Sequence, residues 1–407
     1  METNNHLADM DLLYDAFKAS MKGSSWKEEP QRFENNFLSE LSALNHEITD
    51  GTYHTMPGTE FTLNERGKIR YIHGGRMRDR VVRHALCDGE LNGALRPYLI
   101  YNNGASQKGK GVKFTRDQFE KDLHNYWLEH RSNEGYIAII DYSKFYDNIR
   151  HSNIRELVYP KISPEAQRLM DEIIKNFEID VSYMTDEEYA SCMDRKFDSV
   201  KYAETVPKEL RTGEKFMCKS VDIGDQVSQD IGVFFPTPVD NYITIVRGFK
   251  YYGRYMDDMY IIHNDKKELH QLIREITEIA NGLGMYINDR KTRIVPLSKF
   301  FKFLQIYYRL DENGRVDKKI NSDAVTRERR RIKAYKRKMD RGEMTYDQVE
   351  QACKSWMGNF AKLMSKQQIK NMKSLYQELF GKELVWKPQQ SFLKTVRKSK
   401  QKSTATP

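Results

Sequence analysis

Two adjacent aspartates at the turn of an apolar hairpin constrain the fold of this chain more than any other feature of its sequence. Residues 250–263 are predicted to form two strands, with Met256-Asp257-Asp258 near the turn between them. Neighbouring carboxylates repel each other, so a nearby cation or metal ion would stabilise this arrangement. The alternative is a solvated Asp-Asp turn without a function.

A third carboxylate is predicted to meet this pair. Asp141 directly follows the apolar run at residues 136–140, which is typical of a buried central strand. If that strand and the hairpin are neighbours in one sheet, the three carboxylates converge. Oxygen ligands of this type suit Mg²⁺. Two such ions ~3.5–4 Å apart can activate a 3′-hydroxyl and stabilise a leaving pyrophosphate.

The composition adds a partner class to this prediction. The 407 residues include 39% hydrophobic ones, enough for a large core and two or three domains. The net charge of +9 favours a polyanionic partner, although a basic globular protein without such a partner is the alternative.

The four cysteines have no CxxC spacing, which argues against a zinc or redox motif and against a disulfide framework. No signal peptide or run of ~20 apolar residues is visible, so we expect a soluble cytoplasmic protein that does not enter membranes.

Changes in pattern along the chain predict its domains. We expect an N-terminal helical extension at 1–50, a catalytic region at 51–320, a basic helical domain at 321–393 and a disordered tail at 394–407. Residues 178–219 have no sustained periodicity, which predicts an insertion or long loop.

These motifs resemble those of reverse transcriptases over about residues 33–380. Tyr255-Met256-Asp257-Asp258 resembles the YxDD box, and the run DYSKFYDNI from Asp141 resembles the box that supplies the first metal ligand. The box that begins at Asp141 is most similar to the versions in group II intron and bacterial retroelement enzymes. The resemblance implies an α+β right-hand polymerase fold, with fingers, an antiparallel palm sheet flanked by helices, and a C-terminal helical thumb. It also implies two Mg²⁺ ions, or alternatively Mn²⁺, bound by Asp141, Tyr142, Asp257 and Asp258.

The resemblance assigns further residues to nucleotide binding. Tyr146 stands where these enzymes place an aromatic gate, whose ring would clash with a 2′-hydroxyl. Lys68 and Arg70, on one face of a predicted fingers strand, match residues that grip the triphosphate. Lys291, in a motif ending in Lys-Thr, could approach the triphosphate or act as an acid toward pyrophosphate. A core tyrosine and solvated basic residues are the alternatives.

One box departs from the common QGxxxSP pattern. In Ile223-Gly224-Asp225-Gln226-Val227-Ser228-Gln229, Ile223 replaces Gln and Gln229 replaces Pro. This IGxxxSQ form resembles that of diversity-generating retroelements, where it accompanies low fidelity opposite template adenines. A branched apolar side chain cannot make the polar contact of Gln, and its loss could weaken discrimination by ~1–3 kcal/mol. We expect Ile223, Gly224 and Gln229 to contact the nucleotide.

The resemblance also implies partners. These are an RNA template, a DNA or RNA primer, dNTPs and a small basic accessory protein that forms an oligomer, in a bacterial or phage-encoded system. Antiphage-defence enzymes of the abortive-infection type, retron enzymes and group II-like enzymes remain alternatives. A non-catalytic RNA-binding protein is opposed by the intact aspartates, and an RNA-templated RNA polymerase by Tyr146.

A basic C-terminal segment resembles a thumb that follows the template–primer backbone without reading sequence. The residues expected to bind nucleic acid are Arg327, Arg330, Arg331, Lys333 and Arg337. Just before it, Phe303-Leu304-Gln305 resembles the primer-grip turn, in which the third residue is usually Gly.

Overall fold

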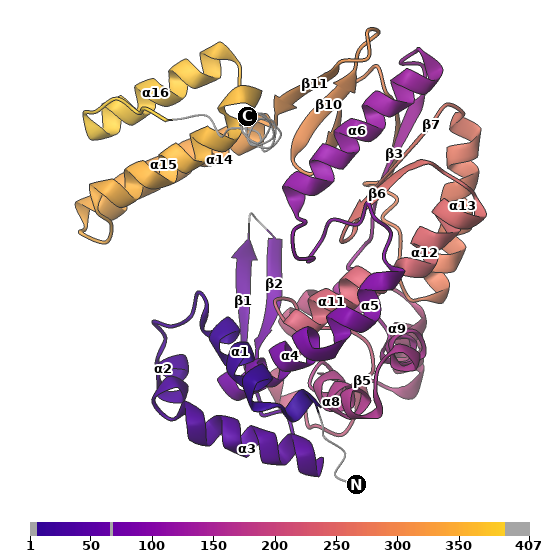
Figure 1. Cartoon of the computed structure of the whole chain (residues 1–407), viewed down its shortest axis with the longest axis vertical. Helices are drawn as coiled ribbons and strands as arrows, with labels where there is room; N and C mark the ends of the chain where they lie inside the picture. Colours follow the sequence, from indigo (N-terminus) through magenta and orange to yellow (C-terminus); the bar gives the residue numbers. More distant parts are fainter. Residues whose placement is uncertain (1–5, 66–67, 387–407) are drawn as a thin grey trace, which may run out of the picture. The chain divides into compact units, whose positions relative to one another are not determined.

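The computed structural model describes residues 6–65 and 68–386, so the predicted disordered tail lies outside the described residues. The chain forms two compact units. The first contains Met1–Tyr126 and Gly135–Pro296, and the second contains Trp127–Glu134 and Leu297–Pro407. Figure 1 labels most of the elements, and each unit is described below by itself.

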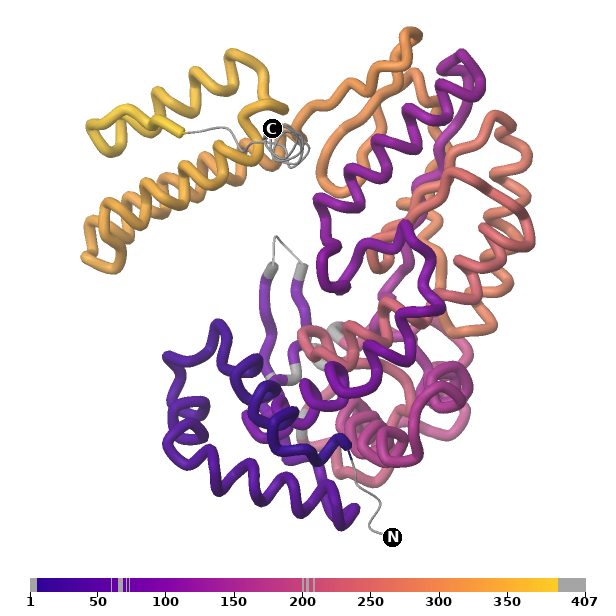
Figure 2. Tube along the Cα trace, in the orientation of Figure 1, coloured from indigo at the N-terminus to yellow at the C-terminus, as the bar shows by residue number. Residues whose placement is uncertain are grey.

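The first unit begins with the expected helical segment. It comprises α1 (Met10–Met21), α2 (Glu28–Asn35) and α3 (Phe37–Asp50). Leu13, Phe17 and Leu41 are buried on the inner faces of these helices. All three helices pack against α4 (Met77–Leu86), beside which the indigo N-terminal tube lies in Figure 2.

The predicted fingers strand is present and belongs to a hairpin. Strand β1 (Thr59–Glu65) pairs antiparallel with β2 (Lys68–Gly74), and the turn residues 66–67 lie outside the described part. Two further helices, α5 (Asn92–Leu95) and α6 (Val112–His130), lie between this region and the central sheet in the sequence.

A four-stranded antiparallel sheet with the order β6-β7-β3-β8 positions the site. Its strands are β3 (Tyr136–Asp141), β6 (Tyr251–Tyr255), β7 (Asp258–His263) and β8 (Arg293–Pro296). The predicted central strand is confirmed, because β3 pairs on both sides and Ile137, Ala138 and Ile140 are fully buried.

Helices flank this sheet and complete its core. They are α7 (His151–Val158), α8 (Pro164–Lys175), α11 (Gln226–Phe234), α12 (Thr237–Asn241) and α13 (Lys266–Gly282). Ser163 caps α8 by accepting a 3.1 Å hydrogen bond from the Ala166 N–H. Asp265 caps α13, whereas Glu268, three positions later, forms an ion pair with Arg247.

The segment at 178–219 is more ordered than its sequence predicts. It contains β4 (Ile179–Asp180), α9 (Asp186–Asp194), α10 (Ser199–Thr205) and β5 (Phe216–Met217), and β4 pairs with β5. Val181, Phe197 and Tyr202 belong to a small core of its own. Elements of two to nine residues are too short to show a periodic pattern, which is why the sequence suggested a loop.

The second unit combines a small sheet with a helical bundle. The sheet has the order β11-β10-β9, from β9 (Phe301–Phe303), β10 (Ile306–Leu310) and β11 (Val316–Ile320). The helices are α14 (Ser322–Asp340), α15 (Tyr346–Phe360) and α16 (Lys366–Phe380). The C-terminal part of this unit begins at Leu297, before the basic helical domain expected at 321–393, because β9 to β11 belong to the same unit. Tyr335, Trp356 and Phe360 pack against the helical core.

None of the helices in the described part of the chain is long and apolar enough to cross a lipid bilayer.

Candidate active site

The central sheet brings two of the predicted aspartates side by side. Asp141 ends β3, Asp258 begins β7, and the two are direct partners in the antiparallel register. Asp257 precedes Asp258 in the turn after β6. Among the described residues, these three carboxylates are not all within 4.8 Å of one another. Such a tight group is not required of a site for two ions that are themselves ~3.5–4 Å apart.

The turn that carries Asp257 has an unusual backbone. Met256 has φ of 53°, a left-handed conformation that non-glycine residues adopt rarely. A positive φ at the first central position, followed by a negative one, is the sign pattern of a type II′ hairpin turn. Backbone strain of this kind costs of order 1–3 kcal/mol and persists only where the surroundings enforce it.

A buried ion pair supports this turn. Arg254 on β6 and Asp240 on α12 are both 0% exposed, and Nη2 lies 2.7 Å from Oδ2. Arg254 Nη1 donates to the Met256 carbonyl oxygen at 3.1 Å, and the Tyr252 hydroxyl donates to Asp240 at 2.5 Å. The net effect on Arg254 is a pKa above its ordinary value. Burial alone would lower this pKa, but the charge of Asp240 and its hydrogen bonds raise it by more.

Sequence reasoning did not identify this pair. One signal was available in the sequence, because Arg254 stands alone within an apolar strand. A buried charge requires a partner, so a buried carboxylate could have been expected to pair with it.

The Lys291 side chain contacts the carboxylate of Asp141. Its Nζ is 2.6 Å from Asp141 Oδ2, and Asn288 Nδ2 approaches the same oxygen at 3.4 Å. Asp141 is 7% exposed, whereas the Lys291 side chain is 48% exposed. The buried carboxylate is therefore paired with the ammonium group of a flexible lysine side chain that is half exposed to solvent.

The backbone beside Asp141 fixes the position of Tyr142. The Asn288 N–H donates to the Asp141 carbonyl at 2.8 Å, and the Ser143 N–H donates to the Tyr286 carbonyl at 2.7 Å. Tyr142 and Ile287 face each other between these two bonds and form a non-hydrogen-bonded antiparallel pair. In such a pair the carbonyl of each residue points away from the other residue, so the Tyr142 carbonyl points away from Ile287. Because its ring is buried, the main-chain carbonyl is the group that Tyr142 could offer to a metal ion.

Tyr146 lies close to the aspartate turn. Its hydroxyl donates to Met256 Sδ at 3.8 Å. A Cβ on Gly232 of α11 would approach the Tyr146 hydroxyl to 3.0 Å, so glycine there allows the ring its position. Burial raises the pKa of Tyr146, the charge of Asp257 raises it further, and Arg70 opposes this.

The predicted fingers residues are placed only in part. Arg70 lies on β2, is half-buried, and its charge acts on Tyr146. The backbone of Lys68 begins β2, but its side chain lies outside the described part of the structure.

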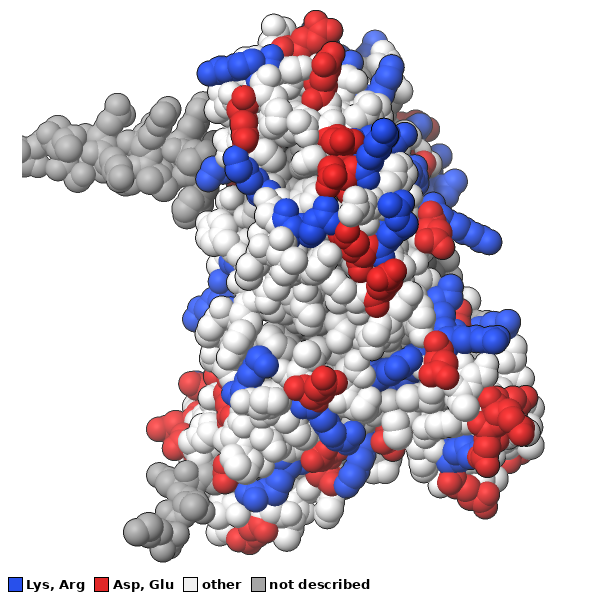
Figure 3. All heavy atoms as spheres, turned by 90° about the vertical axis from the view of Figure 1, so that its right-hand side faces the viewer, with Lys and Arg blue, Asp and Glu red and all other residues white. Residues whose placement is uncertain are grey.

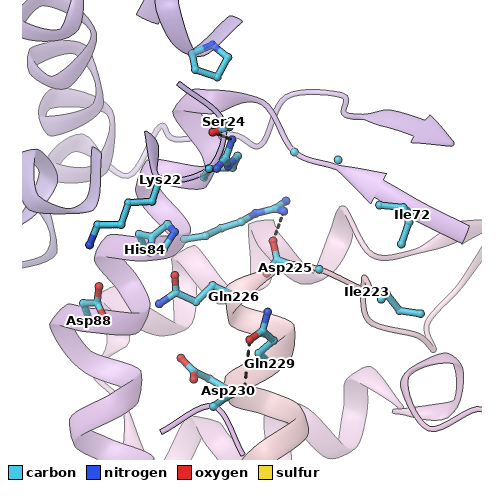
Figure 4. Close-up of a pocket in the computed structure, with 18 of the residues that line it drawn as sticks. Lys22, Ser24, Ile72, His84, Asp88, Ile223, Asp225, Gln226, Gln229 and Asp230 are labelled. Atoms are coloured by element: carbon cyan, nitrogen blue, oxygen red, sulfur yellow. Dashed lines mark hydrogen bonds and ion pairs between the residues drawn. The ribbon is translucent and has the colours of Figure 1, made fainter. Parts of the chain in front are cut away.

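The IGxxxSQ box borders a pocket of about 870 Å³ in the first unit. Ile223, Gly224 and Gln229 line it, together with residues of α4 and of the segment after α1 (Figure 4). Gly224 has φ of 99°, which favours glycine. Gln229 accepts a 3.3 Å hydrogen bond from the Ser106 hydroxyl.

Two acidic residues, one that precedes α11 and one within it, help to form this pocket. Asp225 caps the helix and makes an almost fully buried ion pair with Arg83 on α4, drawn as a dashed line in Figure 4. Asp230 is largely buried, and its Oδ2 has no hydrogen-bond partner within the described residues. Burial raises the pKa of Asp230 to about 6.

In the second unit, α14 carries the predicted nucleic-acid-binding residues on its exposed side. Arg327, Arg330, Arg331, Lys333 and Arg337 are all exposed. Val325 and Ile332, on the opposite face, are buried. By contrast, basic and acidic residues are interspersed on the face shown in Figure 3.

We compared the chain with curated proteins, solved structures and protein families. No curated protein matches the chain. A solved structure of telomerase from Candida albicans, in complex with a fragment of telomeric RNA, matches at 11% identity with a TM-score of 0.44. The match covers 81% of this chain and 54% of that one, so the chain spans about half the length of the telomerase.

The model of the family "Reverse transcriptase (RNA-dependent DNA polymerase)" matches residues 65–308, more than half of the 407 residues. This match, together with the mixed helices and antiparallel sheets, confirms the expected right-hand polymerase fold. The chain belongs to the reverse transcriptase family.

Proposed function

We propose that this chain is an RNA-directed DNA polymerase that copies an RNA template into cDNA from dNTPs. The observation that carries the proposal is the pairing of Asp141 with Asp258 across two strands, with Asp257 in the adjoining turn. Asp141, Asp257, Asp258 and the Tyr142 carbonyl would hold two Mg²⁺ ions, or Mn²⁺, because all four offer oxygen ligands. When bound, the ions would activate the primer 3′-hydroxyl and neutralise charge on the leaving pyrophosphate.

Lys291 would change partners when the site is loaded. Its contact with Asp141 supports a role for this carboxylate in binding cations. A half-exposed lysine is free to rotate away from it. Released from Asp141, Lys291 would reach toward the triphosphate as a point charge.

Tyr146 would select the sugar. Its ring is held between Gly232 and Met256, close enough to Asp257 for the two to interact electrostatically. A rigid ring beside the metal ligands would clash with a ribose 2′-hydroxyl and would accept deoxyribose. Arg70 would contact the phosphates of the same nucleotide, and the sequence predicts the same role for Lys68.

We further infer a role in a diversity-generating retroelement, with errors concentrated at template adenines. Ile223 supports this because it lines the pocket and has no hydrogen-bonding group with which to replace Gln. This role would bring a bacterial or phage host, a cytoplasmic location and a small basic accessory oligomer. Antiphage defence and retron-like activity are the alternatives.

The test is to sequence cDNA from cells that express the chain with its native flanking DNA. Asp257→Ala serves as the inactive control and Ile223→Gln as the fidelity variant. The proposal predicts Asp257-dependent cDNA with substitutions at template adenines that decrease in Ile223→Gln. Faithful Asp257-dependent cDNA would favour a defence or retron-like role. Absence of Asp257-dependent cDNA, with or without phage infection, would contradict polymerase activity.

The exposed basic face of α14 would follow the template–primer backbone. Each phosphate contact releases counterions, so affinity should fall steeply with salt. Reversing Arg330, Lys333 and Arg337 to Glu should weaken RNA binding about equally for all sequences and flatten the salt dependence. Unchanged binding in the triple variant would place the nucleic-acid contact elsewhere.

A further inference from the structure

Three potential metal ligands lie close together at the two ends of the 178–219 segment, within the first unit. Glu178 precedes β4 and Cys218 follows β5, so they are neighbours at the end of the two-stranded ladder. His151 begins α7, and its N–H donates to the Cys218 carbonyl at 3.1 Å. One ligand atom from each of the three residues lies within 4.8 Å of the other two.

The histidine is oriented as a metal ligand. It is fully buried, and its Nε2 lies 2.7 Å from the Ser220 carbonyl oxygen, which can only accept. Nε2 therefore carries the hydrogen, and Nδ1 presents a lone pair. Within the described parts of the chain, Nδ1 has no hydrogen-bond partner, and it lies 3.9 Å from the Glu178 carboxylate. Metal-binding histidines characteristically donate their other ring N–H to such a carbonyl.

The remaining contacts have suitable spacing and accessibility. Cys218 Sγ lies 3.7 Å from Glu178 Oε1, and Cys218 is exposed, so an ion could enter from solvent. Zinc bonds of about 2.0–2.3 Å in a tetrahedron place ligand atoms roughly 3.3–3.8 Å apart. Small side-chain rotations would close the group around an ion.

The chemistry of the set favours zinc over magnesium. A thiolate and an imidazole are ligands of Zn²⁺, whereas Mg²⁺ prefers oxygen atoms alone. One thiolate and one carboxylate would balance the charge of Zn²⁺. Partial desolvation of the sulfur and the nearby Glu178 carboxylate raise the pKa of the Cys218 thiol, so metal binding would release its proton to solvent. Burial lowers the pKa of His151 to about 4, which keeps the imidazole neutral.

The geometry points to a Zn²⁺ site formed by His151 Nδ1, Glu178 and Cys218 Sγ, with water as the fourth ligand. Through these ligands the ion joins both ends of the 178–219 segment to the first residue of α7. The same stretch of chain then pairs with the catalytic region, since the Ser220 N–H donates to the Ile149 carbonyl and the Val221 N–H donates to the Tyr146 carbonyl, both at 3.0 Å. The site is independent of the proposed polymerase activity.

Cobalt substitution tests the site in the full chain. Co²⁺ added in excess Mg²⁺ should give a near-ultraviolet thiolate-to-cobalt charge-transfer band at one equivalent. The band should be lost in Cys218→Ser and kept in Cys192→Ser, which alters a cysteine of the same segment outside the cluster. Ions at the aspartates cannot give this band, because no sulfur ligates them. A wild-type protein without the band, or a Cys218→Ser variant that retains it, overturns the proposal.

A second measurement uses only the wild-type chain, so it does not depend on a variant that folds. One equivalent of Zn²⁺ should slow alkylation of Cys218 by iodoacetamide at least tenfold, as followed by peptide mass spectrometry. Cys192 should react at an unchanged rate. Equal protection of both cysteines, or none for Cys218, contradicts the site.

Discussion

Arg254 donates hydrogen bonds to both carboxylate oxygens of Asp240, and its Nη1 donates to the Met256 carbonyl, so one buried ion pair holds the turn of the aspartate hairpin. Both side chains are fully buried. Removing one charge leaves the other without compensation, which typically costs about 3–5 kcal/mol.

We expect Arg254→Met to lower the free energy of unfolding by that amount. Urea unfolding measures this, with Arg32→Met as control because its pair with Glu28 is highly exposed. Adding Asp240→Leu should cost less than the two single changes together. An unfolding midpoint unchanged by Arg254→Met would contradict the argument.

Lys291→Ala should reduce kcat/KM for dNTPs at least tenfold, because the point charge that reaches the triphosphate is lost. Lys291→Arg should retain part of the activity. Arg290→Ala is the matched control, since Arg290 is the exposed neighbouring residue. Steady-state primer extension measures the effect. Equal rates for the wild type and Lys291→Ala would show that Lys291 only neutralises Asp141.

Tyr146→Val should increase incorporation of rNTPs relative to dNTPs at least tenfold, because it removes the ring that excludes the 2′-hydroxyl. Tyr146→Phe should keep sugar selectivity, because it loses only the 3.8 Å hydroxyl contact with Met256 Sδ. Single-nucleotide extension with each triphosphate separates the two variants. Wild-type selectivity in Tyr146→Val would place the gate elsewhere.

Asp230 should make the first unit less stable as the pH rises. Burial raises its pKa to about 6 in the folded chain, above the ordinary 3.8. Between these values the folded state binds a proton that the unfolded state has lost, so stability falls with rising pH.

The free energy of unfolding of Asp230→Asn, relative to that of the wild type, should therefore increase by up to roughly 3 kcal/mol between pH 4 and pH 7. Asp88→Asn, an exposed residue of the same pocket, serves as control. Urea unfolding across this range measures the difference. A constant difference would show that Asp230 titrates normally.

Gln305→Gly should stabilise the second unit. Leu304 and Gln305 connect β9 and β10 with φ of 42° and 71°, the sign pattern of a type I′ turn, which favours glycine. We expect a gain of about 0.5–1 kcal/mol, since relief of left-handed strain exceeds the entropic cost of glycine. Gln305→Ala should give no gain. Thermal unfolding of the full chain compares the two.

Much of the site followed from local pattern. The apolar run ending at Asp141 and the hairpin whose second strand begins at Asp258 were recognisable because buried strands are short, apolar and sharply bounded. The cap at Ser163 was likewise predictable, because capping depends on residues within one helical turn. The family motifs added roles for residues such as Tyr146 that periodicity alone could not supply.

The sequence by itself determined the central strands, the fingers hairpin and the positions of the three aspartates along the chain, because each depends on neighbours a few residues away. Only the tertiary structure decided that Asp240 pairs with Arg254, that Lys291 lies on Asp141, and that His151 meets Glu178 and Cys218. These contacts join residues 14 to 150 positions apart, and no local pattern specifies which buried polar group finds which partner. Packing of separate elements makes that choice, because a buried charge or lone pair is costly unless the fold supplies its complement.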